Sequence, residues 1–275
     1  MSGLRQEFVQ RSITAICLSA VVVALVLFSP NLILNTFVFL LSLALFFEWM
    51  KVSKASRKKK IIFLLLFSSL ICCILGFGAL LEPIPIITIL GITVWIVIAF
   101  QIFFREGRLS SSFSFTNFWI GLILISTFCL TCFQFVDGSR SFLLIAIFNV
   151  AIFDSGAYII GKNFGKNSFL PELSPNKTIE GLIGGLASSI VFVTLLYILI
   201  EEVSLKASIA LILSIPFALC GDYFFSFLKR KANIKDTGSI LPGHGGLLDR
   251  VDSHLAGIPM TAFFSHLLYM LGSYF

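Results

Sequence analysis

Long apolar runs alternate with short polar segments along the whole chain, and each run is continuous over 17 to 22 residues. A helix needs about 20 apolar residues to cross about 30 Å of hydrocarbon. Inside hydrocarbon a helix also satisfies its own backbone N–H and C=O groups. The pattern therefore predicts an all-α, polytopic integral membrane protein with about nine transmembrane helices. The predicted spans are Ser12–Phe28, Asn31–Phe47, Ile61–Leu81, Ile84–Phe104, Phe115–Phe135, Ser141–Ile160, Ile179–Ile200, Lys206–Phe225 and Leu255–Phe275.

The composition agrees with this class and excludes others. Of the 275 residues, 57% are hydrophobic and 12% are charged, whereas soluble domains carry about 25% charged residues. Disorder needs low hydrophobicity, and an outer-membrane barrel alternates apolar and polar residues over strands of about 10 residues. The first run follows Arg5 and Arg11 but leads at once into a second. We therefore expect a retained helix and no cleaved signal peptide.

The basic residues predict the orientation. Lys and Arg favour the cytoplasmic side of short loops. With nine spans and a cytoplasmic N-terminus, 18 of the 20 basic residues lie inside, and only Arg140 and Lys206 lie outside. We therefore expect residues 1–140 to form about five N-terminal helices in the inner (cytoplasmic) membrane. Residues 141–275 would form the remaining helices and carry the cytoplasmic motifs.

Two predicted cytoplasmic stretches, Asp154–Gly185 and Gly221–Ser253, are unusually polar. Asp154 and Asp222 stand at the ends of apolar helices, where a carboxylate costs about 2.5–3.5 kcal/mol and indicates function. On a helix, four polar residues of the second stretch share one face because they recur at i, i+4, i+7 and i+8: Asp222, Ser226, Lys229 and Arg230. Carboxylates suit a divalent cation, and Lys and Arg suit phosphate oxygens.

A glycine-rich segment, 242–246, follows this face and would let backbone N–H groups approach an anion. Asp249 and Asp252 come next, at a spacing that returns a second carboxylate to the metal. In the first stretch, Lys177 and Thr178 precede a predicted helix, whose free N–H groups favour anions. Structural alternatives stay open. Lys229–Lys231 would serve as a topology anchor, and glycines 181, 184 and 185 as helix-packing positions.

The residues of these stretches resemble the signature of the phosphatidate cytidylyltransferase (CDP-diacylglycerol synthase) family. The main motif reads Ser226-x-Leu-Lys-Arg-x4-Lys-Asp-x-Gly-x2-Leu-Pro-x-His-Gly-Gly-Leu-x-Asp-Arg-Val-Asp252. A second, Ser174-Pro-x-Lys-Thr-x-Glu-Gly181, is also similar, apart from Ile179 where many members carry an aromatic residue. The motifs cover about Asp154–Ser253, and the N-terminal half resembles the family only in hydropathy.

The resemblance implies that CTP and phosphatidic acid condense to CDP-diacylglycerol and pyrophosphate on the cytoplasmic side. It implies Mg²⁺ as cofactor, leaves a second cation such as K⁺ and a homodimer open, and implies membrane lipids but no nucleic acid as partners. Its expected metal ligands are Asp222 and Asp249, then Asp154 and Asp252. The expected catalytic group adds Lys229, Lys235, Arg250 and a positioning His244 to Asp222 and Asp249. The expected substrate contacts are Ser174, Lys177, Thr178, Ser226, Arg230, Gly245 and Gly246.

Two other functions fit part of the pattern. A membrane phosphotransferase, such as a polyprenol kinase or a polyprenyl-phosphate sugar-phosphate transferase, would also use Mg²⁺ and basic loops. Its signature would lack the segment from Lys235 to Arg250. A transporter commonly has repeated halves with broken helices near the midplane, but the polar motifs here fall only in the C-terminal half.

Overall fold

In the computed structural model, the described residues are 19–53, 56, 58, 61–62, 64–65, 67–68, 84–104, 109–110, 113–114, 116–171, 174, 177–201, 203–238 and 245–272. Over these residues the regular structure is helical, and β-pairing is limited to isolated bridge positions, among them Ser168 with Thr178. The labelled helices are α2 (Asn31–Val52), α4 (Ile84–Phe104), α5 (Phe118–Gly138), α6 (Arg140–Phe164), α7 (Ile179–Leu199), α8 (Leu205–Lys231) and α9 (Leu248–Gly272).

Among the described residues, six helices, α2 and α4 to α8, are long and apolar enough to cross a membrane. The protein is thus an integral membrane protein, as predicted. The first predicted span is described only as the helix Ser19–Phe28, and Ile61–Leu81 lies largely outside the described residues. The number nine and the absolute orientation therefore remain predictions.

The predicted boundaries were too narrow at one end of several helices. α2 continues to Val52 and α8 to Lys231, and α9 begins at Leu248 although Leu255 was expected. Hydropathy marks only the part of a helix that suits hydrocarbon, whereas hydrogen bonding continues into polar turns. These extra turns carry Glu48, Lys229 and Asp249, so they extend the helices into the polar region.

Three helices begin at hydroxyl residues that cap them. The side chains of Ser139, Thr178 and Ser204 accept hydrogen bonds from the backbone N–H groups of Phe142, Gly181 and Ala207 at the starts of α6, α7 and α8. Such a cap satisfies one of the unpaired N–H groups at a helix start. The polar residues between apolar runs thus set where these helices begin.

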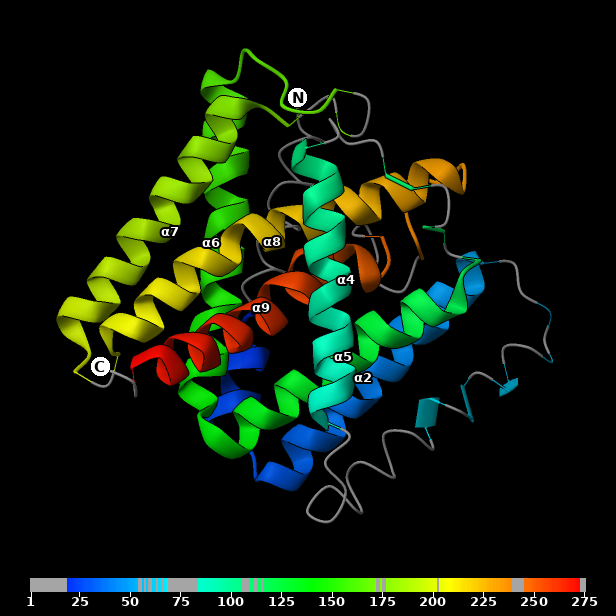
Figure 1. Ribbon diagram of the computed structural model, residues 1–275, viewed down its shortest axis with the longest axis horizontal. Helices are drawn as coiled ribbons and strands as arrows, with labels where there is room; N and C mark the ends of the chain where they lie inside the picture. The colour runs from blue at the N-terminus through cyan, green and yellow to red at the C-terminus, as the bar shows by residue number, and fades with distance from the viewer. Residues whose placement is uncertain are drawn as a thin grey trace, which may run out of the picture.

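The helices pack as neighbouring pairs, with α8 beside α9, α6 beside α7 and α2 beside α5 (Figure 1). Glycines let the paired backbones approach closely. A Cβ added to Gly184 of α7 would lie 2.4 Å from Cβ of Ile160 in α6. A Cβ added to Gly221 of α8 would lie 2.5 Å from the carbonyl oxygen of Asp252 in α9. The packing role considered for Gly184 is therefore confirmed.

Contacts between helix ends fall into two groups, as alternating spans require. At one end of the bundle, the Arg140 guanidinium donates to the carbonyl oxygen of Ser29. At the other end, Lys231 Nζ donates to the carbonyl oxygen of Phe113 at 2.9 Å, and Lys177 pairs with Asp222. The two polar stretches therefore meet at one end of the bundle, as the loop assignment predicted.

Candidate active site

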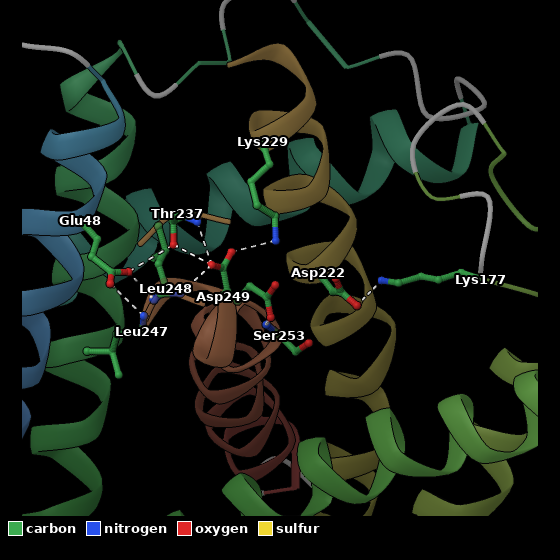
Figure 2. Close-up of polar contacts among 11 residues, drawn as sticks. Glu48, Lys177, Asp222, Lys229, Thr237, Leu247, Leu248, Asp249 and Ser253 are labelled. Atoms are coloured by element: carbon green, nitrogen blue, oxygen red, sulfur yellow. Dashed lines mark hydrogen bonds and ion pairs between the residues drawn. The ribbon is translucent and has the colours of Figure 1, made fainter. Parts of the chain in front are cut away.

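An ion pair joins the two polar stretches, Asp154–Gly185 and Gly221–Ser253, at the candidate active site. Lys177, just before α7, donates from Nζ to Oδ2 of Asp222 on α8 (Figure 2). Lys177 Nζ also lies 4.3 Å from the ring centroid of Tyr223, a distance at which a ring face attracts a cation. Both charged side chains stay partly exposed, at 24% and 28%. The pair is therefore within reach of a solvent-borne ligand.

The entry to α7 is held by its own first turn. Thr178 caps the helix through Gly181 N. Glu180 accepts hydrogen bonds from the backbone N–H groups of Lys166 and Asn167 at 3.0 and 3.2 Å. A carboxylate in a first helical turn is also favoured by the helix dipole. These contacts fix the end of the α6–α7 connection from which Lys177 extends.

A second ion pair joins α8 to α9. Lys229 Nζ lies 2.9 Å from Oδ1 of Asp249, in the first turn of α9. The other oxygen, Oδ2, accepts from Thr237 N at 2.8 Å, Thr237 Oγ1 at 3.0 Å and Gly246 N at 2.9 Å (Figure 2). Gly245 has a φ of 82°, a conformation that glycine adopts without strain. Asp249 thus organises the segments on both sides of residues 239–244.

Two further carboxylates lie beside Asp222. Asp252, 8% exposed, accepts a hydrogen bond from Ser253 N at 2.9 Å. The Ser253 side chain in turn interacts with the carboxylate of Asp154 in α6. Asp252 and Asp154 both interact electrostatically with Asp222. The structure therefore brings carboxylates from α6, α8 and α9 into one region.

Carboxylate oxygens, such as those in this region, are the ligands that a hard divalent cation prefers. Among the described residues, no group of three or more His, Cys, Asp or Glu side chains is arranged to hold a metal ion. Proteins usually bind Mg²⁺ through only one or two carboxylates, with water and substrate phosphates completing the shell. Of the expected ligands, Asp252 is the more suitable partner for Asp222, because the oxygens of Asp249 already accept four hydrogen bonds.

The remaining expected site residues surround this region. Ser174 and Ser226 are partly buried, and Gly246 is buried. Ser174 accepts a hydrogen bond from Lys177 N at 3.2 Å through its carbonyl oxygen. Three cationic residues are exposed around the ends of α8 and α9: Arg230, Lys235 and Arg250. His244 lies outside the described residues, so its expected role stays a prediction.

The amino-acid sequence of the chain matches a known protein family. The family model described as "Cytidylyltransferase family" matches residues 9–268. The chain belongs to the cytidylyltransferase family. Because the match runs through both halves, the N-terminal helices are part of the family's pattern as well as the polar motifs.

Curated relatives match part of this chain. The phosphatidate cytidylyltransferase of Bacillus subtilis (strain 168) is 43% identical over 113 residues, which cover 40% of this chain and 42% of the relative. That of Staphylococcus haemolyticus (strain JCSC1435) is 41% identical over 135 residues, covering 46% and 52%. That of Staphylococcus aureus (strain COL) is 42% identical with the same coverage. The chain therefore spans about half the length of the curated relatives it matches.

Sequence reasoning missed one buried carboxylate that contacts the candidate active site. Glu48 of α2 is 1% exposed and accepts hydrogen bonds from Leu247 N, Leu248 N and Thr237 Oγ1. The signal was present, because Glu48 stands near the end of an apolar helix, as Asp154 and Asp222 do. It could not be singled out because no other acidic residue lies between Glu7 and Glu82, so nothing marks it as part of a carboxylate cluster.

Proposed function

We propose that this cytidylyltransferase condenses CTP with phosphatidic acid and releases CDP-diacylglycerol and pyrophosphate. The observation that carries the proposal is the Lys177–Asp222 ion pair, which joins two motifs 45 residues apart in the chain. Together with Lys229, Asp249 and Asp252, it forms a cluster of carboxylates and lysines at one end of the helices. The name of the matched relatives supports the choice of lipid substrate.

The proposed reaction needs no covalent bond between the protein and either substrate. A phosphate oxygen of phosphatidic acid forms a bond to the α-phosphorus of CTP. The bond from that phosphorus to the oxygen bridging to the β-phosphate breaks, and pyrophosphate leaves with the electron pair. A phosphate monoester has a second pKa near 6, so the nucleophile is largely dianionic and needs no protein base. Positioning and charge neutralisation remain as the tasks of the site.

The residues of the cluster divide these tasks. Lys177 would exchange its carboxylate partner for a phosphate oxygen, and Lys229, still held by Asp249, would offer its remaining N–H donors to another. Phosphate oxygens are strong acceptors for such cationic donors. Asp222 and Asp252 would hold Mg²⁺, whose charge would offset that of the phosphates when bound. Asp249 would keep Lys229 and the 245–248 segment in place. Neither a second cation such as K⁺ nor a homodimer is required for this division.

The location of the cluster supports a reaction between a soluble and a membrane-bound substrate. The cluster lies where the apolar helices end, so CTP can arrive from water and phosphatidic acid from the adjacent leaflet. Its loops hold most of the basic residues, which favour the cytoplasmic side. We therefore place the proposed active site on the cytoplasmic face of the inner membrane.

Product analysis tests the proposal. Purified protein is incubated with phosphatidic acid, Mg²⁺ and labelled CTP, with ATP and dATP as controls, and lipid and pyrophosphate products are counted. We expect CDP-diacylglycerol and pyrophosphate in equal amounts from CTP, and none from Asp222→Asn. Asp137→Asn, the same change at the other end of the bundle, serves as the matched control and should stay active. Equal use of ATP, or full activity of Asp222→Asn, would refute the proposal.

A further inference from the structure

Glu48 is a buried carboxylate in the half of the chain that carries none of the recognised motifs. It lies one turn before the end of α2, with 1% of its surface exposed. A buried carboxylate is retained only where hydrogen bonds or opposite charge compensate for its lost hydration. The partners of Glu48 therefore indicate what it does.

All of its described partners belong to the segments around the candidate active site. Oε1 accepts from Leu247 N at 2.9 Å, and Oε2 accepts from Leu248 N at 2.8 Å and Thr237 Oγ1 at 3.2 Å (Figure 2). Leu248 is the first residue of α9, so the carboxylate faces the positive end of the helix dipole. Glu48 thus caps α9 from a helix about 200 residues earlier in the chain.

Two glycines make room for this carboxylate. A Cβ added to Gly238 would lie 2.6 Å from Oε1 of Glu48, and one added to Gly246 would lie 2.7 Å from Oε2. Both distances are too short for real carbon atoms. A side chain at Gly238 would therefore displace Glu48, and one at Gly246 would displace Thr237 Oγ1, 2.3 Å away, as well as Glu48. The Lys235–Asp252 motif therefore contains two positions shaped around a residue of α2.

We propose that Glu48 is a positioning residue that sets where α9 begins and thereby places Asp249 against Lys229 and Asp252 toward Asp222 in the candidate active site. The expected effect of Glu48 on turnover rests on the proposed function, whereas its effect on the start of α9 does not. Glu48 and Asp249 share Thr237 Oγ1 as a donor. Displacement of Glu48 would therefore reach Asp249 directly through one side chain.

The first test replaces the carboxylate by its neutral isostere. In Glu48→Gln the amide offers one acceptor oxygen, and its NH₂ faces a backbone N–H, so a donor meets a donor. A small misplacement of reacting groups costs about 100-fold in rate, so we expect kcat to fall roughly tenfold or more, with a smaller change in KM for CTP. Ser189→Ala, which removes a buried hydrogen bond to Asn149, is the control for a general loss of stability.

A second variant leaves Glu48 unchanged. Gly238→Ala introduces the Cβ that would collide with Oε1 and should likewise lower kcat. Gly138→Ala is its matched control, because a Cβ there meets nothing within 4 Å. This pair keeps the proposal testable if Glu48→Gln fails to fold.

Limited trypsin digestion gives a readout that does not depend on activity. The exposed Lys235 and Arg250 flank the segments that Glu48 holds, so both test variants should be cleaved there faster than wild type and the controls. Wild-type turnover with an unchanged digestion pattern would overturn the proposal. So would an equal loss of kcat in Ser189→Ala. If the wild type fails to use CTP and phosphatidic acid, the digestion result still decides the positioning role.

Discussion

Asp249 offers the sharpest test of how the site divides its work. Its side chain is 8% exposed and accepts four hydrogen bonds, one of them from the ammonium of Lys229. In Asp249→Asn, one oxygen can still face Thr237 and Gly246, but the new NH₂ faces Lys229. A hydrogen bond to a charged group contributes about 1.5–3 kcal/mol. Because Lys229 retains 16% exposure, we expect a loss of about 2 kcal/mol in the free energy of unfolding.

The assay separates this structural loss from a loss of metal binding. The described free cysteines 129, 132 and 220 are buried, so a thiol-reactive dye reports thermal unfolding in detergent. Asp249→Asn should lower the unfolding midpoint, and it should cut kcat/KM roughly tenfold because Lys229 is no longer held in position. The Mg²⁺ concentration for half-maximal activity should stay within about twofold of wild type. Asp222→Asn and Asp252→Asn should raise it at least about tenfold.

Two results would refute these assignments of Asp249 and Asp252. If Asp249→Asn unfolds at the wild-type temperature but needs tenfold more Mg²⁺, Asp249 is a metal ligand and its hydrogen bonds are secondary. If Asp252→Asn leaves the Mg²⁺ dependence unchanged, the choice of Asp252 as the partner of Asp222 is also wrong. Circular dichroism of each variant checks that its helices are intact.

Three other predictions follow from the helix contacts and the proposed metal. Ser189→Ala removes the 2.7 Å hydrogen bond to Asn149. Thermal unfolding should show a loss of about 0.5–1.5 kcal/mol in the free energy of unfolding, and activity assays should show an unchanged kcat. Gly184→Val places atoms against Ile160 and should separate α6 from α7, lowering both the unfolding midpoint and activity; wild-type values would refute this. Chelation of Mg²⁺ should abolish turnover but leave helical circular dichroism unchanged, and Mg²⁺ alone should restore it; persistent turnover would exclude the metal.

The fold class could be predicted because membrane hydrocarbon imposes a simple rule on sequence. Every described long apolar run is helical, and the structure places Asp222 and Lys229 on one helix, as their spacing indicated. The ends of the helices were harder to predict from the sequence. α9 begins at Leu248 because Glu48 and the local turn supply partners for its first N–H groups. Glu48 is about 200 residues away in the chain, so a hydropathy window around α9 does not include it.

The site was predicted only in part for the same reason. The motif predicted that Lys177 and Asp222 serve one site, and their ion pair agrees with that prediction. The different surroundings of Asp249 and Asp252 were not evident, because both are aspartates three residues apart in the same helical turn. What distinguishes them is their partners: Asp249 faces Lys229 and Thr237, whereas Asp252 lies by Asp222. Sequence spacing predicts which residues share a face but not which donors meet them.

The two basic residues predicted on the outer face strengthen the assignment of sides. The Arg140 guanidinium donates to the carbonyl oxygen of Ser29, which closes the turn between two apolar helices. Lys206 Nζ lies 6.0 Å from the ring centroid of Tyr269, near the end of α9. Arg140 and Lys206 thus each have a local partner, and among the described residues Lys177, Lys229 and Lys231 lie at the end that holds the carboxylates. Anionic lipids attract such a basic face. Because both proposed substrates are anionic, the charges that orient the protein would also concentrate its substrates at the site.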